Sequence, residues 1–260
     1  MRELNTRTIL MIHGAFVTAA MWDNWKGYFE HHGYKVIAPP WPHKNLPAPA
    51  LRQQHPDPLV ASIRLRDLVH YYGDIASVQA ETPIIMGHSL GGLITQLLLQ
   101  KNIGAAGIAI HSAPPLGVYS LKYSVLKSSF RPLGFYASAN EPYLLSFKEW
   151  QYAVTNGMPH QQQLATYEQY AVPESRRILR DGLTAAARVD FGKPHAPLLL
   201  MGGSHDHVVP ASLVYANFKR YKQNGYLRHF RELPGRNHFV LGQPTWEEDA
   251  AYVLDWIRTY

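Results

Sequence analysis

The residues best placed to do chemistry lie in one short stretch, GHSLG at residues 87–91. An apolar run at residues 83–86 precedes it, and apolar residues at spacings of three and four follow it, so we expect a buried strand, a sharp turn and a helix. Glycines on either side of Ser89 remove the side chains that would collide in such a turn. The helix that begins at Leu90 points unpaired N–H groups at whatever the hydroxyl attacks. The stretch therefore predicts a serine nucleophile.

This pattern resembles the G-x-S-x-G nucleophile elbow of the α/β-hydrolase superfamily, with Gly87, Ser89 and Gly91 at the matching positions. The resemblance covers nearly the whole chain, except the cap and the loop at residues 39–58. It implies an α/β fold of the α/β-hydrolase type, with a mostly parallel sheet of about six strands flanked by helices and an inserted helical cap. The two amino-terminal strands of the family's usual eight are expected to be missing or vestigial.

The elements that must position Ser89 can be read from apolar patterns along the chain. Short apolar runs predict strands at residues 8–12, 34–38, 83–86, 106–110, 197–201 and 228–233. Amphipathic spacing predicts helices between strands at residues 21–32, 64–78 and 211–221, and a helix after the last strand at residues 245–258. Residues 39–58 contain seven prolines and are expected to form a loop without regular structure. The alternation of strand and helix is typical of a parallel sheet.

The alternation stops between residues 114 and 194, where aromatic residues accumulate and helices are expected at about 144–155 and 174–187. The resemblance implies that this segment is the cap, which covers the pocket and selects the substrate. We therefore expect a first part of the hydrolase core at residues 1–113, the cap insertion at residues 114–194 and a second part of the core at residues 195–260.

The resemblance also implies the acid and the base that would activate Ser89. Asp206 follows the strand at 197–201 and precedes a proline and a helix, which is the position of the family's acid; Asp190 is the nearest competitor. His238 lies in a glycine-containing loop between the last strand and the last helix, where the family places its base. In this arrangement His238 takes the Ser89 proton and Asp206 holds the imidazole in the right tautomer.

Two backbone N–H groups are expected to bind the oxyanion of the reaction, one from Ala15 in the loop after the first strand and one from Leu90. Side chains near these groups are the candidates for substrate binding, and they are Phe16, His88, Phe147, Trp150 and Phe239. Phe147 and Trp150 belong to the expected cap, where packing on the core explains most single aromatic residues equally well.

Charge and composition limit the classes of partner that this protein is expected to bind. The formal net charge is +6, but the basic residues are scattered in pairs without a recognition motif, so no nucleic acid is expected. No run of about eighteen apolar residues exists, so no membrane partner is expected. The apolar stretch at residues 9–12 is too short for the core of a signal peptide. The chain has no cysteine, which excludes disulfides and thiol chemistry and fits a cytoplasmic protein.

No cofactor or metal is expected either. His205 and His207 flank Asp206, but the sequence has no further ligand at a spacing diagnostic of a metal site.

These observations predict a serine hydrolase that cleaves a carboxylic ester of a small to medium apolar substrate through an acyl-enzyme. A ligand-binding or receptor-type module on the same fold is the alternative from another class, and lactonase or perhydrolase activity would use the same three residues. Dehalogenases and epoxide hydrolases of this superfamily use an aspartate nucleophile, which Ser89 argues against. Hydroxynitrile lyases of this superfamily carry lysine directly after the catalytic histidine, where this chain has Phe239, so lyase activity is disfavoured. The acyl group, the alcohol group and the oligomeric state are not predicted.

Overall fold

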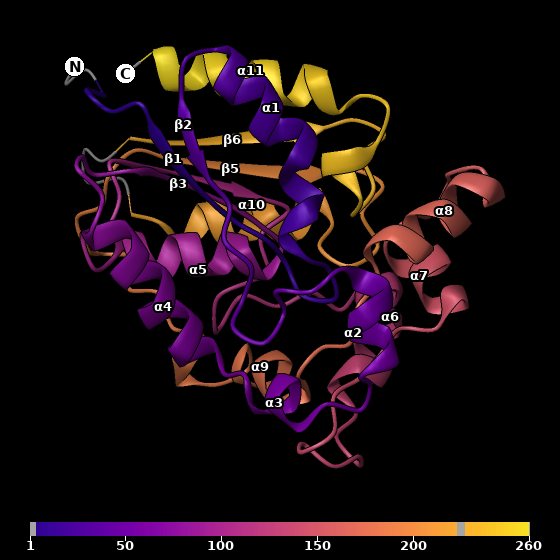
Figure 1. Ribbon diagram of the computed structural model, residues 1–260. Helices are drawn as coiled ribbons and strands as arrows, with labels where there is room; N and C mark the ends of the chain where they lie inside the picture. Colours follow the sequence, from indigo (N-terminus) through magenta and orange to yellow (C-terminus); the bar gives the residue numbers. More distant parts are fainter. Residues whose placement is uncertain (1–3, 223–226, 260) are drawn as a thin grey trace.

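The computed structural model describes residues 4–222 and 227–259 (Figure 1). Within them, six strands form one sheet in the order β2-β1-β3-β4-β5-β6, and every neighbouring pair is parallel. The strands are β1 (Thr8–Ile12), β2 (Lys35–Ile37), β3 (Ile84–His88), β4 (Ala106–Ile110), β5 (Leu198–Gly203) and β6 (Arg228–Leu233). The predicted bounds of the strands at 8–12, 106–110 and 228–233 are confirmed. In a parallel sheet all carboxyl ends meet at one edge, so the loops that follow these strands lie together.

Helices cover both faces of this sheet (Figure 1). Outside the region between β4 and β5 they are η1 (Ala19–Trp22), α1 (Asp23–His31), α2 (Ala48–Gln53), α3 (Pro58–Ser62), α4 (Leu65–Ser77), α5 (Leu90–Leu99), α10 (Ala211–Arg220), η3 (Val240–Gly242) and α11 (Trp246–Arg258). Side chains alternate along β1, so Ile9 and Met11 pack with α1 and α11 while Leu10 and Ile12 pack with α4, α5 and α10. The central strands are therefore buried on both faces, as their continuous apolar runs predict.

Between β4 and β5 the chain leaves the sheet. We call residues 114–194 the inserted segment; it contains α6 (Tyr123–Leu133), α7 (Phe147–Ala153), α8 (His160–Tyr170), α9 (Arg176–Asp181) and η2 (Ala185–Ala187). Figure 1 shows these helices beside and below the sheet, and contacts join α2 to α8 and α3 to α9. The division of the chain at residues 114 and 194 stays a prediction.

The prediction that residues 39–58 form no regular structure is wrong. They contain α2, and α3 begins at Pro58. Proline is tolerated in the first turn of a helix, because the N–H groups there have no partner inside the helix. Each helix has a proline in its first turn, and the Asp57 side chain caps α3 by accepting from the N–H of Leu59.

The helices of the inserted segment were predicted only in part. The expected helix at 144–155 is the shorter α7, because Ser146 and Glu149 form a capping box at its start. The expected helix at 174–187 divides into α9 and η2. Helices α6 and α8 were not predicted.

Within residues 4–222 and 227–259, no helix combines the length and the apolar character that a membrane crossing requires.

Candidate active site

Ser89 occupies the turn between β3 and α5 in a conformation that few side chains adopt. Its φ is +54°, in the left-handed region. The turn is held on both sides, because the Ser89 N–H donates to the Ile110 carbonyl at 3.0 Å and its own carbonyl accepts from the Ala113 N–H at 2.9 Å. Gly14 packs directly against it, since a Cβ there would lie 2.8 Å from the Ser89 Cβ. The loops after β1, β3 and β4 therefore meet at this hydroxyl.

The structure brings the three predicted residues together. The Nε2 of His238 lies 3.0 Å from the Oγ of Ser89, although 149 positions separate them in the chain. The Nδ1 of His238 lies 2.6 Å from the Oδ2 of Asp206. An ionised carboxylate only accepts, so Nδ1 carries the proton and Nε2 is free to accept one from the serine. The Oδ1 of Asp206 accepts from the N–H groups of Val208 and Val209, both at 2.7 Å, so the carboxylate cannot turn.

A second imidazole shares this carboxylate. His111, at the end of β4, is fully buried, and its Nδ1 lies 2.7 Å from the same Oδ2 of Asp206. Gly203 makes room for it, because a side chain there would collide with the ring. Burial alone would raise the pKa of Asp206, but the charge of His238 and the N–H donors of His111 and His238 together hold that pKa far below its ordinary value. Asp206 is thus kept ionised.

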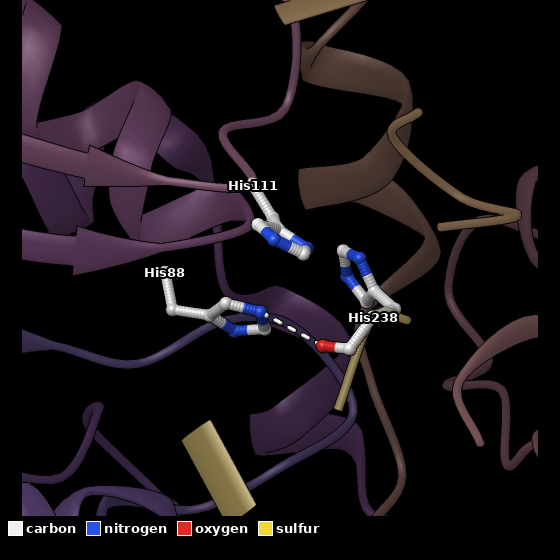
Figure 2. A group of neighbouring side chains, drawn as sticks. All are labelled: His88, His111 and His238. Atoms are coloured by element: carbon white, nitrogen blue, oxygen red, sulfur yellow. Dashed lines mark hydrogen bonds between the residues drawn. The ribbon is translucent and has the colours of Figure 1, made fainter. Parts of the chain in front are cut away.

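His88 bonds to the backbone of His238, and no hydrogen bond among the described residues joins its ring to the Ser89 hydroxyl. Its Nε2 donates to the backbone carbonyl of His238 at 3.0 Å, and it is 3% exposed. Burial, followed by the nearby His238 and His111, holds the pKa of His88 well below its ordinary value, so the ring is neutral. Figure 2 shows the three rings facing one another, and one nitrogen of each lies within 4.8 Å of the other two. Both nitrogens of His238 are bonded within the protein, so we interpret the cluster as a hydrogen-bond network around Asp206.

The backbone N–H groups of Ala15 and Leu90 belong to the segments that adjoin Ser89. Among the described residues, no hydrogen bond uses the N–H of Ala15 or of Leu90. Leu90 follows the serine at the start of α5, and Ala15 belongs to the β1 loop (residues 13–16), which packs on Ser89 through Gly14. These are the positions from which the sequence predicts the two oxyanion donors.

The other candidate residues are distributed around this centre. Phe16, Trp150 and Phe239 belong to one apolar cluster, in which the rings of Trp150 and Phe239 lie 6.4 Å apart. Phe147 packs instead on α8, with its ring 5.6 Å from those of His160 and Tyr167. Substrate binding by these side chains stays a prediction.

The sequence offered Asp190 as another acid and His205 and His207 as metal ligands, and the structure gives these side chains other surroundings. Asp190 is exposed, and its carboxylate accepts from the N–H of Gly192 at 3.0 Å. His205 is exposed, and the Nδ1 of His207 donates to the Tyr152 carbonyl at 2.8 Å.

A family model described as "Alpha/beta hydrolase family" matches residues 9–250. The chain belongs to the alpha/beta hydrolase family. No curated protein matches its sequence.

Solved structures of α/β hydrolases share the fold at low identity. A monoacylglycerol lipase of Paleococcus ferrophilus is 16% identical, with a TM-score of 0.67 over 97% of this chain and 94% of its own. A methylesterase from Arabidopsis is 13% identical, with a TM-score of 0.68 over 97% and 99%. A pyrethroid hydrolase from Sphingobium faniae JZ-2 is 19% identical, with a TM-score of 0.64 over 97% and 98%. At these identities the likeness shows the fold alone.

Three buried polar residues of this hydrolase were missed in the sequence. His111 could have been noticed, because a polar residue that follows a central parallel strand lies at the edge where α/β proteins bind ligands. Lys44 and Glu174 form a buried ion pair, and no local pattern marks either of them, because they lie 130 positions apart.

Proposed function

We propose that this hydrolase cleaves carboxylic esters, with Ser89 as nucleophile, His238 as general base and Asp206 as its orienting acid. The observation that carries the proposal is the 3.0 Å separation between Ser89 Oγ and His238 Nε2, with the other ring nitrogen bonded to Asp206. The structural neighbours that are named as a methylesterase, a lipase and a pyrethroid hydrolase support an ester as substrate.

The geometry suits acyl transfer. As Oγ attacks the carbonyl carbon, His238 Nε2 takes its proton, and Asp206 stabilises the imidazolium that results. The N–H groups of Ala15 and Leu90 bind the oxyanion, a contribution of about 3 kcal/mol per donor. The imidazolium then protonates the departing alcohol. Water attacks the acyl-enzyme with the same histidine as base, which releases the carboxylic acid and restores Ser89.

We further propose that the inserted segment is the cap of the site and that the substrate is apolar and of small to medium size. Phe16 and Phe239 adjoin the predicted donor Ala15 and the predicted base His238 in the chain, and Trp150 of α7 packs with them in one apolar cluster. An apolar acyl or alcohol group would find a complementary surface there.

The test compares the wild-type protein with Ser89→Ala on p-nitrophenyl esters of graded chain length. We expect kcat to fall by about 10⁴-fold or more, since no other group supplies the nucleophile. Ser62→Ala is the matched control, because Ser62 is exposed and bonds only within α3. Equal turnover by Ser89→Ala would overturn the proposal. A competent enzyme should be labelled at Ser89 by a fluorophosphonate probe within minutes, so the absence of labelling together with no ester turned over would favour the ligand-binding alternative.

A further inference from the structure

A buried ion pair ties the inserted segment to the loop after β2. The Nζ of Lys44 lies 2.8 Å from the Oε2 of Glu174, and neither side chain is exposed to solvent. Removing two charges from water costs several kcal/mol, so such a pair persists where further hydrogen bonds complete it. The partners of each charge therefore indicate what the pair holds in place.

The partners of Glu174 lead to the β1 loop. Its Oε2 also accepts from the N–H of Phe16 at 3.1 Å, and its Oε1 accepts from the N–H of Ser175 at 2.9 Å. The carbonyl of Phe16 accepts from the N–H of Val172 at 3.0 Å. Both backbone groups of Phe16 are thus bonded to the inserted segment.

Phe16 needs such support, because its φ is +64° and a bulky residue is strained in the left-handed region. The residue directly before it is Ala15, the predicted oxyanion donor. The Phe16 N–H lies in the Ala15–Phe16 peptide plane, which is joined through the Cα of Ala15 to the plane that carries the Ala15 N–H. A change in the backbone at Phe16 would turn the first plane, and a compensating rotation at Ala15 would then redirect the Ala15 N–H.

Lys44 is connected through Trp41 to His13, the first residue of the β1 loop. Its ammonium lies 4.6 Å from the centre of the Trp41 ring. That ring stacks on His13 at 4.7 Å, and the Trp41 N–H donates to the Nε2 of His13 at 3.3 Å. The ion pair is thus connected to the first residue of the β1 loop through Trp41 and to its last residue through Glu174.

We propose that Glu174, held by Lys44, is a positioning residue for the oxyanion-binding loop at residues 13–16. The inference rests on the proposed function, because it assigns the Ala15 N–H to the oxyanion. It makes the donor at Ala15 dependent on a carboxylate from the inserted segment, so the segment completes the site as well as covering it.

The test is Glu174→Gln, which keeps the shape of the side chain but turns an amide N–H toward groups that donate. We expect kcat to fall at least about tenfold, while KM changes less than about threefold. Complete loss of one oxyanion donor lowers kcat by about 10²-fold or more, so a misdirected donor should cause part of that loss. The affinity for a trifluoromethyl ketone, which forms an oxyanion with Ser89, should fall by the same factor. Rates are expressed per active site, counted by fluorophosphonate labelling to completion.

Asp181→Asn is the matched control. Asp181 ties the inserted segment to the start of α4 by accepting from the Arg64 side chain at 2.6 Å and the Leu65 N–H at 3.0 Å, and among the described residues it has no hydrogen bond to the β1 loop. This variant should lose thermal stability, as Glu174→Gln does, but keep kcat per active site. If Glu174→Gln keeps its kcat and its ketone affinity, or if Asp181→Asn loses as much of both, the proposal is overturned.

A second measurement does not need turnover. Hydrogen exchange in the peptide that contains residues 13–18 should be faster in Glu174→Gln than in the wild type, and unchanged in Asp181→Asn. Unchanged exchange in Glu174→Gln overturns the positioning role even if the protein hydrolyses no ester. Faster exchange without Ser89-dependent hydrolysis supports the role and overturns the proposed function instead.

Discussion

The carboxyl edge of the sheet and the inserted segment differ in which side chains they bury. At the edge, polar groups are buried and bonded: Ser89, Asp206 and His238 are 9%, 2% and 7% exposed, and each has a partner within 3.0 Å. In the inserted segment, large apolar side chains face solvent around α6, namely Tyr119, Leu121, Tyr123, Leu126, Phe130, Phe135 and Tyr136. The rigid sheet therefore supplies a preorganised polar centre, whereas the surface of the insertion carries little of the folding energy.

The largest expected effect belongs to the edge. Asp206→Asn should lower kcat by about 10⁴-fold, because an amide cannot hold the two imidazole N–H donors as the carboxylate does and His238 takes the wrong tautomer. Steady-state kinetics on an activated ester measure the change. Asp190→Asn is the control and should be indistinguishable from the wild type. Equal rates in both variants would mean that Asp206 is only a structural residue.

His111→Phe sharpens the comparison by removing one of the two imidazole donors on Asp206 and putting an aromatic ring in its place. The carboxylate then has one partner fewer and interacts more strongly with His238, which stabilises the imidazolium. We expect kcat/KM at neutral pH to fall less than about tenfold, because Asp206 still accepts from the Nδ1 of His238. A loss as large as that of Asp206→Asn would contradict this role. His32→Phe, at the C-cap of α1, serves as control.

The smallest effect is expected on the surface of the insertion. Leu121 and Tyr136 are 88% and 99% exposed, so Leu121→Ser with Tyr136→Ser should change the free energy of unfolding by less than about 0.5 kcal/mol. Trp150, in the same segment, is fully buried, and Trp150→Ala should cost about 3–5 kcal/mol. Urea denaturation measures both. A large loss of unfolding free energy in the Leu121→Ser, Tyr136→Ser double variant would show that these two side chains make stabilising contacts.

Much of the sheet could be predicted because its signals are local. β1 and β4 are short, mostly apolar runs, and each ends directly before a histidine. Ser89, Asp206 and His238 could be proposed as a group from the family resemblance, their chain order and the strand that precedes each, and the structure places their side chains within hydrogen-bonding distance. α6 was missed although Tyr123, Leu126 and Phe130 recur at helical spacing. These side chains face solvent, and Pro132, a residue that usually ends a helix, lies inside it. The Lys44–Glu174 pair depends on how distant segments pack, which no single stretch encodes.

The Lys44–Glu174 contact also limits how this enzyme can be rebuilt. A chimera that exchanges the whole inserted segment for that of a relative, in order to transplant its substrate preference, would remove Glu174 and leave the Lys44 ammonium buried beside Trp41 without a counter-charge. The donor sequence must therefore bring an equivalent carboxylate, or Lys44 must be replaced by an apolar residue in the same step. Libraries that vary only α7 and α8 avoid this difficulty, because both helices end before Val172 and Glu174.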